Sequence, residues 1–117
     1  YIQYAHVRAN SILRKNHSRI PQKSEYTYPL EASEIQLIDL IARFPNEVQR
    51  AAADMKPLYI TNYSFKLAQA FNDFYNTCPV MQVDEPQKSA RLRLVAAAKQ
   101  TLANSLALLG ITAPEAM

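Results

Sequence analysis

The 117-residue sequence is long enough to bury one core but too short for two domains, and its 49% apolar and 20% charged residues are typical of a folded globular domain. It contains one glycine and one cysteine, which excludes glycine-rich phosphate loops, internal disulfides and cysteine-based zinc clusters. No apolar run approaches the roughly 20 residues of a membrane-spanning helix. We therefore expect a soluble protein of the reducing cytoplasm.

Charge is distributed unevenly along the chain. Residues 1–24 have a net charge of +5, residues 25–86 of −5 and residues 87–117 of +3. If helices from the two ends packed side by side, they would form one positive face, which is typical of proteins that bind polyanions. Solvated charge at each end is the simpler alternative, and charge alone favours it.

Apolar residues recur at helical spacing throughout the sequence, and no stretch sustains the alternation of a β-strand. The first predicted helix covers residues 1–17. A surface loop is expected over residues 18–33, because prolines, serines and charged residues interrupt the helical pattern there. Ser33 is the predicted N-cap of a second helix, which should end near Phe44.

The rest of the chain is divided by prolines, which suit the first turn of a helix. They predict a third helix over residues 46–55 and a fourth over residues 58–77. A fifth helix over residues 88–109 should end at Gly110, the one residue suited to a left-handed C-cap. The predicted fold is all-α, an antiparallel up-and-down bundle of four to five helices.

The sequence offers few groups for a catalytic or metal site. Its two histidines, His6 and His17, lie about three helical turns apart and cannot bind one metal ion together. Cys78 lies among apolar residues and is expected to pack as a small hydrophobic residue. Glu31 and Glu34 lie one turn apart near a helix start, where acids favour the helix dipole. The residues therefore predict neither a catalytic nor a metal site.

One stripe of the first predicted helix combines aromatic and basic side chains: Tyr1, Tyr4, Arg8, Ser11 and Lys15. This combination suits single-stranded nucleic acid, because unstacked bases lie on tyrosine rings while basic groups contact phosphates. The alternative is that both tyrosines are half-buried against a neighbouring helix with their hydroxyls in water, which is common for tyrosine.

Four stretches together resemble one protein family: the opening YIQYAHVRANSILRK, the PVMQVDEP connection after AFNDFYNTC, the RLRLVAAAKQTLANSLALLGI helix and the terminal APEAM. They resemble the C-terminal anticodon-binding domain of arginyl-tRNA synthetases, an all-helical domain called the DALR type. The resemblance covers essentially the whole chain in order. Its YAHxR start and LLGIxxPExM finish are the most specific parts.

The resemblance implies that the domain binds the anticodon stem-loop of arginine tRNA. Every arginine anticodon has a middle C, because the codons CGN and AGR share a middle G, and a splayed loop can present that base to a protein. ATP, Mg²⁺ and the aminoacylation chemistry would belong to a catalytic domain of the same parent chain. We therefore expect residues 1–117 to be a single, non-catalytic domain of a longer synthetase, as the helical start at Tyr1 also indicates.

Carried over position by position, the family's anticodon contacts fall on Tyr1, Tyr4, Arg8, Tyr75 and Met117, which would converge at one end of the bundle. The resemblance implies that the tyrosines stack on bases or wedge between them. Arg8 would contact a phosphate or a base edge, and Met117 or its carboxylate would pack against a flipped base.

Four further residues are candidates for the same interface. His6 would orient the first helix or touch the RNA backbone. Charge alone makes Arg91, Arg93 and Lys99 candidates for phosphate contacts.

The sequence departs from the family pattern at two points. The penultimate residue, basic in many members, is Ala116, and the stretch nearest to a literal DALR is ARLR, residues 90–93. Two alternatives stay open. One is the related domain of another synthetase, such as the glycyl β subunit, against which the ending LLGITAPEAM argues. The other is a helical protein-interaction module whose tyrosine stripe binds a protein partner.

Overall fold

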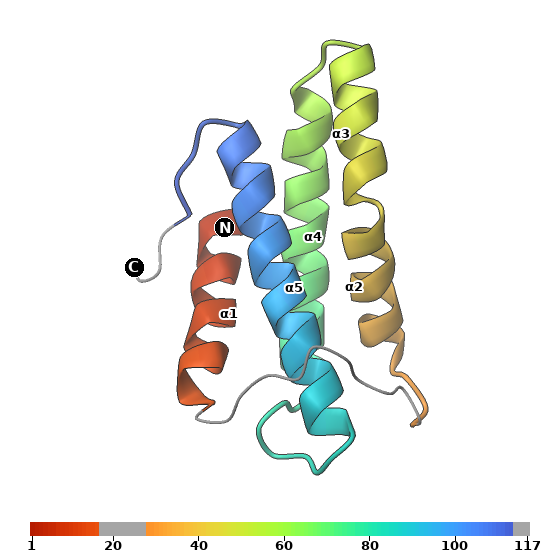
Figure 1. Cartoon of the computed structure of the whole chain (residues 1–117), viewed down its shortest axis with the longest axis vertical. Helices are drawn as coiled ribbons and strands as arrows, with labels where there is room; N and C mark the ends of the chain where they lie inside the picture. The colour runs from red at the N-terminus through yellow and green to blue at the C-terminus, as the bar shows by residue number, and fades with distance from the viewer. Residues whose placement is uncertain (17–27, 114–117) are drawn as a thin grey trace.

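The computed structural model describes residues 1–16 and 28–113, and within these ranges the chain forms five helices and no strand (Figure 1). The all-α prediction is therefore confirmed. The boundaries of the helices lie within about two residues of the predicted ones where both are described, and those of the fourth helix coincide with them. The helices are α1 (Ile2–Lys15), α2 (Ala32–Ala42), α3 (Phe44–Ala53), α4 (Leu58–Thr77) and α5 (Gln87–Leu108).

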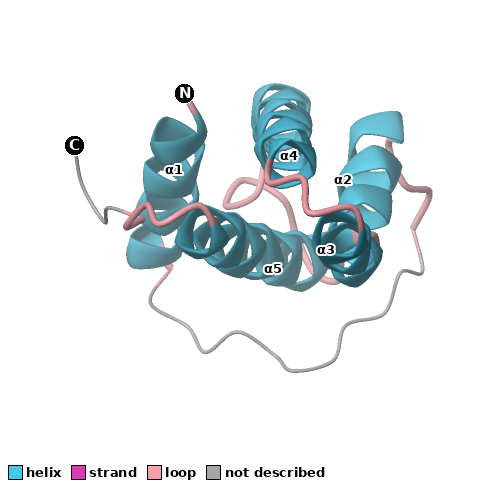
Figure 2. Ribbon diagram, turned by 90° about the horizontal axis from the view of Figure 1, so that it is seen from above, coloured by secondary structure: helices cyan, strands magenta, loops and turns pink. Residues whose placement is uncertain are grey.

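Helices α1 and α4 run in one direction, while α2, its continuation α3, and α5 run in the other (Figure 1). Seen from above, α4 lies between α1 and α2, and α5 packs against all three (Figure 2). Helix α5 is antiparallel to α1 and α4, and α2 is antiparallel to α4, as expected for an up-and-down bundle. Helices α1 and α4 run parallel. Tyr1 contacts Phe65 and Arg8 contacts Asn72, and the two residues of each pair are 64 positions apart in the sequence.

Helix α4 supplies the centre of the core. Leu67, Phe71 and Phe74 are fully buried at helical spacing on this helix, as the sequence pattern predicts. Leu37 of α2 and Leu102 of α5 are also fully buried in the same cluster. The small side chains of Ala5 and Ala9 let α1 pack closely against α4 and α5. Cys78, at the end of α4, is buried in this cluster as a small hydrophobic residue.

The start of α2 differs from the prediction, because its N-cap is Glu31 rather than Ser33. The Glu31 carboxylate accepts from the backbone N–H of Glu34, and the Glu34 carboxylate accepts from the backbone N–H of Glu31 at 3.0 Å. This reciprocal capping box satisfies two donors that the helix leaves unpaired. The hydroxyl of Ser33 instead lies 2.7 Å from that of Thr77, so it joins α2 to the end of α4.

Two helices end through a residue in the left-handed conformation. Gly110, predicted for this role, has a φ of 76°, and the N–H of Ile111 reaches back to the carbonyl of Leu106 at 2.9 Å. The end of α3 repeats the arrangement without a glycine. Met55 has a φ of 53°, and the N–H of Lys56 donates to the carbonyl of Ala51 at 2.9 Å. The sequence did not reveal this second left-handed position.

Candidate nucleic-acid interface

Helices α1 and α4 bring Tyr4, Arg8 and Tyr75 together around one guanidinium group. The carbon at the centre of the Arg8 guanidinium lies 4.7 Å from the centre of the Tyr4 ring and 4.8 Å from that of Tyr75. Nη1 of Arg8 donates to Oδ1 of Asn72 at 3.0 Å. Tyr4 and Arg8 share a face of α1 because they are one turn apart, and Asn72 and Tyr75 share a face of α4 for the same reason.

The accessibility of this cluster decides what it can do. The Tyr4 and Tyr75 side chains are 48% and 43% exposed, whereas Asn72 is buried. Asn72 therefore holds the guanidinium from the protein side while both rings remain open to solvent. The Tyr75 ring is supported from within by the buried Phe71, whose ring centre lies 6.5 Å away. The arrangement presents a fixed cation between two aromatic surfaces, which suits an anionic, π-rich ligand.

A second exposed aromatic pair lies along the same two helices. The rings of Tyr1 and Phe65 have centres 5.2 Å apart with an interplanar angle of 40°. Both side chains are exposed. Because α1 and α4 run parallel here, this pair precedes the Arg8–Asn72 contact by seven residues on each helix, about 10 Å along the axis. Together the two groups form an aromatic track, which consists of Tyr1, Tyr4, Arg8, Phe65 and Tyr75.

Sequence reasoning missed Phe65 and Asn72. A signal for Phe65 was available, because it lies two positions before the buried Leu67 and so falls outside the buried stripe of α4. A phenylalanine on the solvent side of an amphipathic helix indicates a binding surface more than a core. No comparable signal marks Asn72, whose role depends on the packing of α1 against α4.

Arg91 is not supported as a phosphate contact, because it is buried. Its side chain is 5% exposed, and its Nη2 lies 3.1 Å from Oε1 of Glu34, whose side chain is 0% exposed. Nη1 donates to the backbone carbonyl of Pro79 at 2.8 Å. These contacts join α5 to α2 and to the segment after α4, so Arg91 has a structural role. Charge in the sequence could not distinguish a buried base from an exposed one.

The other candidates lie at different places. His6 is buried, which fits a role in orienting α1 and leaves it out of reach of an RNA backbone. Lys99 is partly buried and donates from Nζ to Oδ1 of Asn10 at 2.7 Å, which ties α5 to α1. Arg93 lines a surface hollow between α2 and α5, away from the aromatic track between α1 and α4. Met117 lies outside the described residues.

The end of the described chain returns to the start of α1. After α5 ends, the backbone carbonyl of Thr112 accepts a hydrogen bond from Nε2 of Gln3 at 3.4 Å. Gln3 directly precedes Tyr4 in α1. The last residues that the structure describes therefore lie beside the start of α1.

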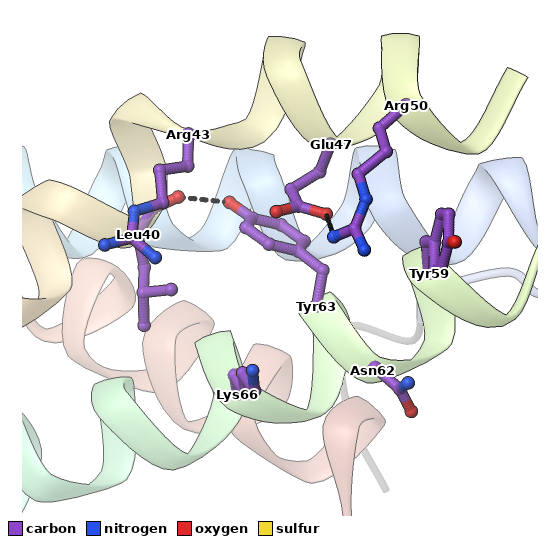
Figure 3. A pocket seen from close by; sticks show the side chains of 8 residues that line it. All are labelled: Leu40, Arg43, Glu47, Arg50, Tyr59, Asn62, Tyr63 and Lys66. Atoms are coloured by element: carbon purple, nitrogen blue, oxygen red, sulfur yellow. Dashed lines mark hydrogen bonds and ion pairs between the residues drawn. The ribbon is translucent and has the colours of Figure 1, made fainter. Parts of the chain in front are cut away.

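A separate polar hollow of about 240 Å³ lies where α2, α3 and α4 meet (Figure 3). Its cations are Arg43, Arg50 and Lys66, and Arg50 is 3.8 Å from the carboxylate of Glu47. The hydroxyl of Tyr63 donates to the carbonyl of Leu40, and burial followed by the nearby charge of Glu47 raises the pKa of Tyr63 well above its usual 10. Tyr63 is thus held as a neutral donor to the backbone and is unsuited to acid–base chemistry at neutral pH.

No group of three or more histidine, cysteine, aspartate or glutamate side chains is placed to hold a metal ion within residues 1–16 and 28–113. In the same part of the chain, no helix combines the length and apolarity that crossing a membrane requires.

Comparison with known proteins identifies the family. Residues 2–117 match the model of the DALR anticodon binding domain. The chain is 43% identical to an arginine–tRNA ligase of Pyrococcus furiosus and 40% identical to one of Thermococcus sibiricus, in each case over its whole length. It covers 20% and 19% of those two proteins, so it spans about a fifth of the length of these curated relatives.

A solved structure gives the same assignment. The arginyl-tRNA synthetase of Thermus thermophilus superposes on this structure with a TM-score of 0.84 at 36% sequence identity. The superposition covers the whole of this chain and 21% of that protein. Sequence and fold agree over all five helices, and the chain therefore belongs to the family of DALR anticodon-binding domains.

Proposed function

We propose that this chain binds the anticodon loop of arginine tRNA, as the anticodon-binding domain of an arginyl-tRNA synthetase that acts in the cytoplasm. Its catalytic domain, on the same parent chain, would bind ATP and Mg²⁺ and attach the amino acid. The observation that carries the proposal is the Arg8 guanidinium, fixed by Asn72 between the exposed rings of Tyr4 and Tyr75. The family and the names of its relatives support the same function.

The chemistry of the aromatic track fits an unpaired anticodon loop. Bases that leave the stack of an RNA loop bind on aromatic rings and are read along their hydrogen-bonding edges. Within the described residues the guanidinium of Arg8 makes one hydrogen bond, to Asn72, so it retains N–H groups for a base edge or a phosphate. Tyr4 and Tyr75 would stack on bases beside it, and Tyr1 with Phe65 would support a neighbouring nucleotide.

Met117 is included on the resemblance alone, because it lies outside the described residues. In the family pattern, Met117 or its carboxylate would pack against a displaced base.

The proposal is tested by measuring the affinity of the domain for an arginine anticodon stem-loop at low salt, beside a copy whose middle C is replaced by another base. We expect tighter binding of the stem-loop with the middle C, and loss of this preference in Tyr75→Ala. Equal binding of both RNAs would reduce the site to a basic surface without base recognition. No binding of either would contradict the proposal and favour a protein-interaction module.

A further inference from the structure

The large apolar side chains that stay exposed among the described residues fall into two groups of different chemistry. One group is aromatic and forms the aromatic track along α1 and α4: Tyr1, Tyr4, Phe65 and Tyr75. The other group is aliphatic: Met55, Leu58, Leu108 and Ile111. Ile35 of α2 is outside both groups. The first group has an explanation in RNA binding, but the second has none so far.

Three residues of the second group, Met55, Leu58 and Leu108, are here called the aliphatic end; they lie at the turn between α3 and α4 and at the end of α5 (Figure 1). Ile111 is not included, because its neighbour Thr112 is hydrogen-bonded to Gln3 of α1. Met55 and Leu108 line one shallow hollow of about 420 Å³. Its lining is apolar apart from a single charged residue, Lys56. By contrast, the hollow of Figure 3 has four charged residues among its eight. Without an array of cations, this surface is suited to a protein rather than to RNA.

The conformation of Met55 adds a second observation. The residue that ends a helix in the left-handed conformation is usually glycine or asparagine, because a larger side chain is strained there. At φ 53° this position carries a methionine that is 86% exposed. The turn thus holds a flexible apolar side chain away from the bundle, as is common where methionines contact a partner.

The aliphatic end is distant from the Arg8 cluster of the aromatic track. Leu58 begins α4; Phe65 lies seven residues later, about 10 Å along the helix, and Tyr75 lies 17 residues later, about 25 Å along it. After Leu109, which lines the hollow, the described chain turns toward α1, where the carbonyl of Thr112 accepts a hydrogen bond from Gln3. The surface is therefore open at the end of the bundle that the proposed RNA site leaves unused.

We propose that the aliphatic end docks against an apolar surface of the remaining part of the synthetase chain, an inference that rests on the proposed function. The relatives provide the reason for this occupant. This chain spans about a fifth of each of the two relatives and of the solved synthetase, so in those proteins the matching domain is accompanied by about four times its own length. Docking at this end would leave the Arg8 cluster of the track free for the anticodon, because Leu58 and Tyr75 are about 25 Å apart along α4.

Methionine oxidation gives a direct test, because Met55 is oxidised by hydrogen peroxide at a rate that follows its exposure. The rate is measured by mass spectrometry in the isolated domain and in the full-length synthetase that contains it, with the partly buried Met81 as internal reference. We expect oxidation of Met55 to be about tenfold slower in the full-length protein. Equal rates in the two proteins would overturn the proposal.

A matched pair of variants locates the contact. In the full-length protein, Leu108→Lys should restore the faster rate at Met55, whereas Ile35→Lys, an equally polar change at the exposed residue outside both groups, should leave it slow. Protection of Met55 in the isolated domain that increases with protein concentration would identify a second copy as the occupant and overturn the proposal.

RNA binding separates this inference from the proposed function. Leu108→Lys should leave the affinity of the isolated domain for the anticodon stem-loop unchanged. Conversely, Tyr75→Ala should weaken that affinity without changing the oxidation rate of Met55. Failure of RNA binding with intact protection of Met55 would contradict the proposed RNA ligand but not the docking surface.

Discussion

Arg91 of α5 and Glu34 of α2 form an ion pair inside the bundle, with Nη2 of Arg91 3.1 Å from Oε1 of Glu34 and a second contact from Nε to Oε2 at 3.3 Å. Further hydrogen bonds satisfy the remaining polar groups of both side chains. Glu34 also accepts from the hydroxyl of Tyr28 at 2.8 Å and from the backbone of Glu31, and Arg91 also donates to Pro79. One carboxylate therefore caps α2, and its partner joins α2 to α5 and to the segment after α4.

We expect Glu34→Gln to lower the free energy of unfolding by about 3 kcal/mol, because it leaves the charge of Arg91 buried without its partner. Chemical denaturation monitored by circular dichroism measures this change. The double variant Glu34→Leu with Arg91→Met is the control, since replacing both charges with apolar groups is often close to neutral. A double variant as unstable as Glu34→Gln would indicate that the hydrogen bonds to Tyr28 and Pro79, rather than the charge pair, dominate.

The stability of the domain should fall at acidic pH in a way that depends on Glu34. Burial alone would raise the pKa of Glu34, but hydrogen bonds from Arg91, from the Glu31 backbone and from Tyr28, together with the charge of Arg91, lower it below its usual 4.5. A carboxylate with a lowered pKa stabilises the fold fully above its unfolded pKa, and this contribution is lost as the pH falls through the folded pKa.

Denaturation curves between pH 7 and pH 3 check this expectation. The difference in unfolding free energy between wild type and Glu34→Gln should be constant above about pH 5 and shrink below pH 4.5, because only the wild type has the carboxylate to protonate. A difference that stays constant down to pH 3 would show that protonation of Glu34 does not contribute to acid unfolding.

We expect Arg8→Ala to weaken binding of the anticodon stem-loop by about 1–3 kcal/mol and to reduce its dependence on salt. Arg8→Lys should restore only part of the affinity, because an ammonium group keeps the charge but lacks the planar fork that fits between Tyr4 and Tyr75. Fluorescence anisotropy at several salt concentrations measures both effects. Loss of helical circular dichroism in Arg8→Ala would instead assign a structural role to Arg8.

Tyr4→Ala and Tyr75→Ala should each weaken RNA binding by about 1–3 kcal/mol, the usual value of a base stacked on an aromatic ring. Their effects should not be additive, because both rings contact the same guanidinium. A double-mutant cycle by calorimetric titration tests this coupling. Phe65→Ala offers an independent test of the second aromatic pair, since its effect should add to that of Tyr75→Ala. Unchanged affinity in all three single variants would contradict the assigned interface.

The two left-handed positions should respond in opposite ways to substitution. Gly110→Ala should destabilise the domain by about 1 kcal/mol, because its φ of 76° strains any side chain although no atom lies within 4 Å of an added Cβ. Met55→Gly should raise stability by up to about 1 kcal/mol by removing that strain. Thermal unfolding would register each change as a shift of about 4 °C. A destabilised Met55→Gly would mean that the methionine side chain packs against the bundle.

The sequence predicted most of the fold because its helices are amphipathic and are separated by proline. The clearest case is α4, whose predicted limits coincide with those in the structure. The N-cap of α2 was misplaced because serine is the more common capping residue, and only the reciprocal bonds of Glu31 and Glu34 reveal the actual start.

The candidate site was predictable only in part. Tyr4 and Arg8 share a helix face, so their proximity follows from spacing alone. The partner residues on α4 depend on how two helices distant in sequence pack, which the spacing cannot give. Arg91 could not be placed from the sequence, because charge in a basic segment predicts a surface residue, whereas Arg91 is buried in an ion pair. The placement of Arg91 depends on an acid 57 residues away.

The parallel register of α1 and α4 makes the aromatic track sensitive to chain length as well as to side-chain identity. Each residue added to an α-helix turns everything beyond it by about 100°. A single insertion between Tyr1 and Tyr4 would therefore leave Arg8 beside Asn72 only by turning Tyr1 away from Phe65. An insertion of seven residues, close to two full turns, would nearly restore the direction in which Tyr1 points, but would move it about 10 Å along the axis and so separate it from Phe65. The number of residues between Tyr1 and Arg8 must therefore equal the number between Phe65 and Asn72 for both contacts to form.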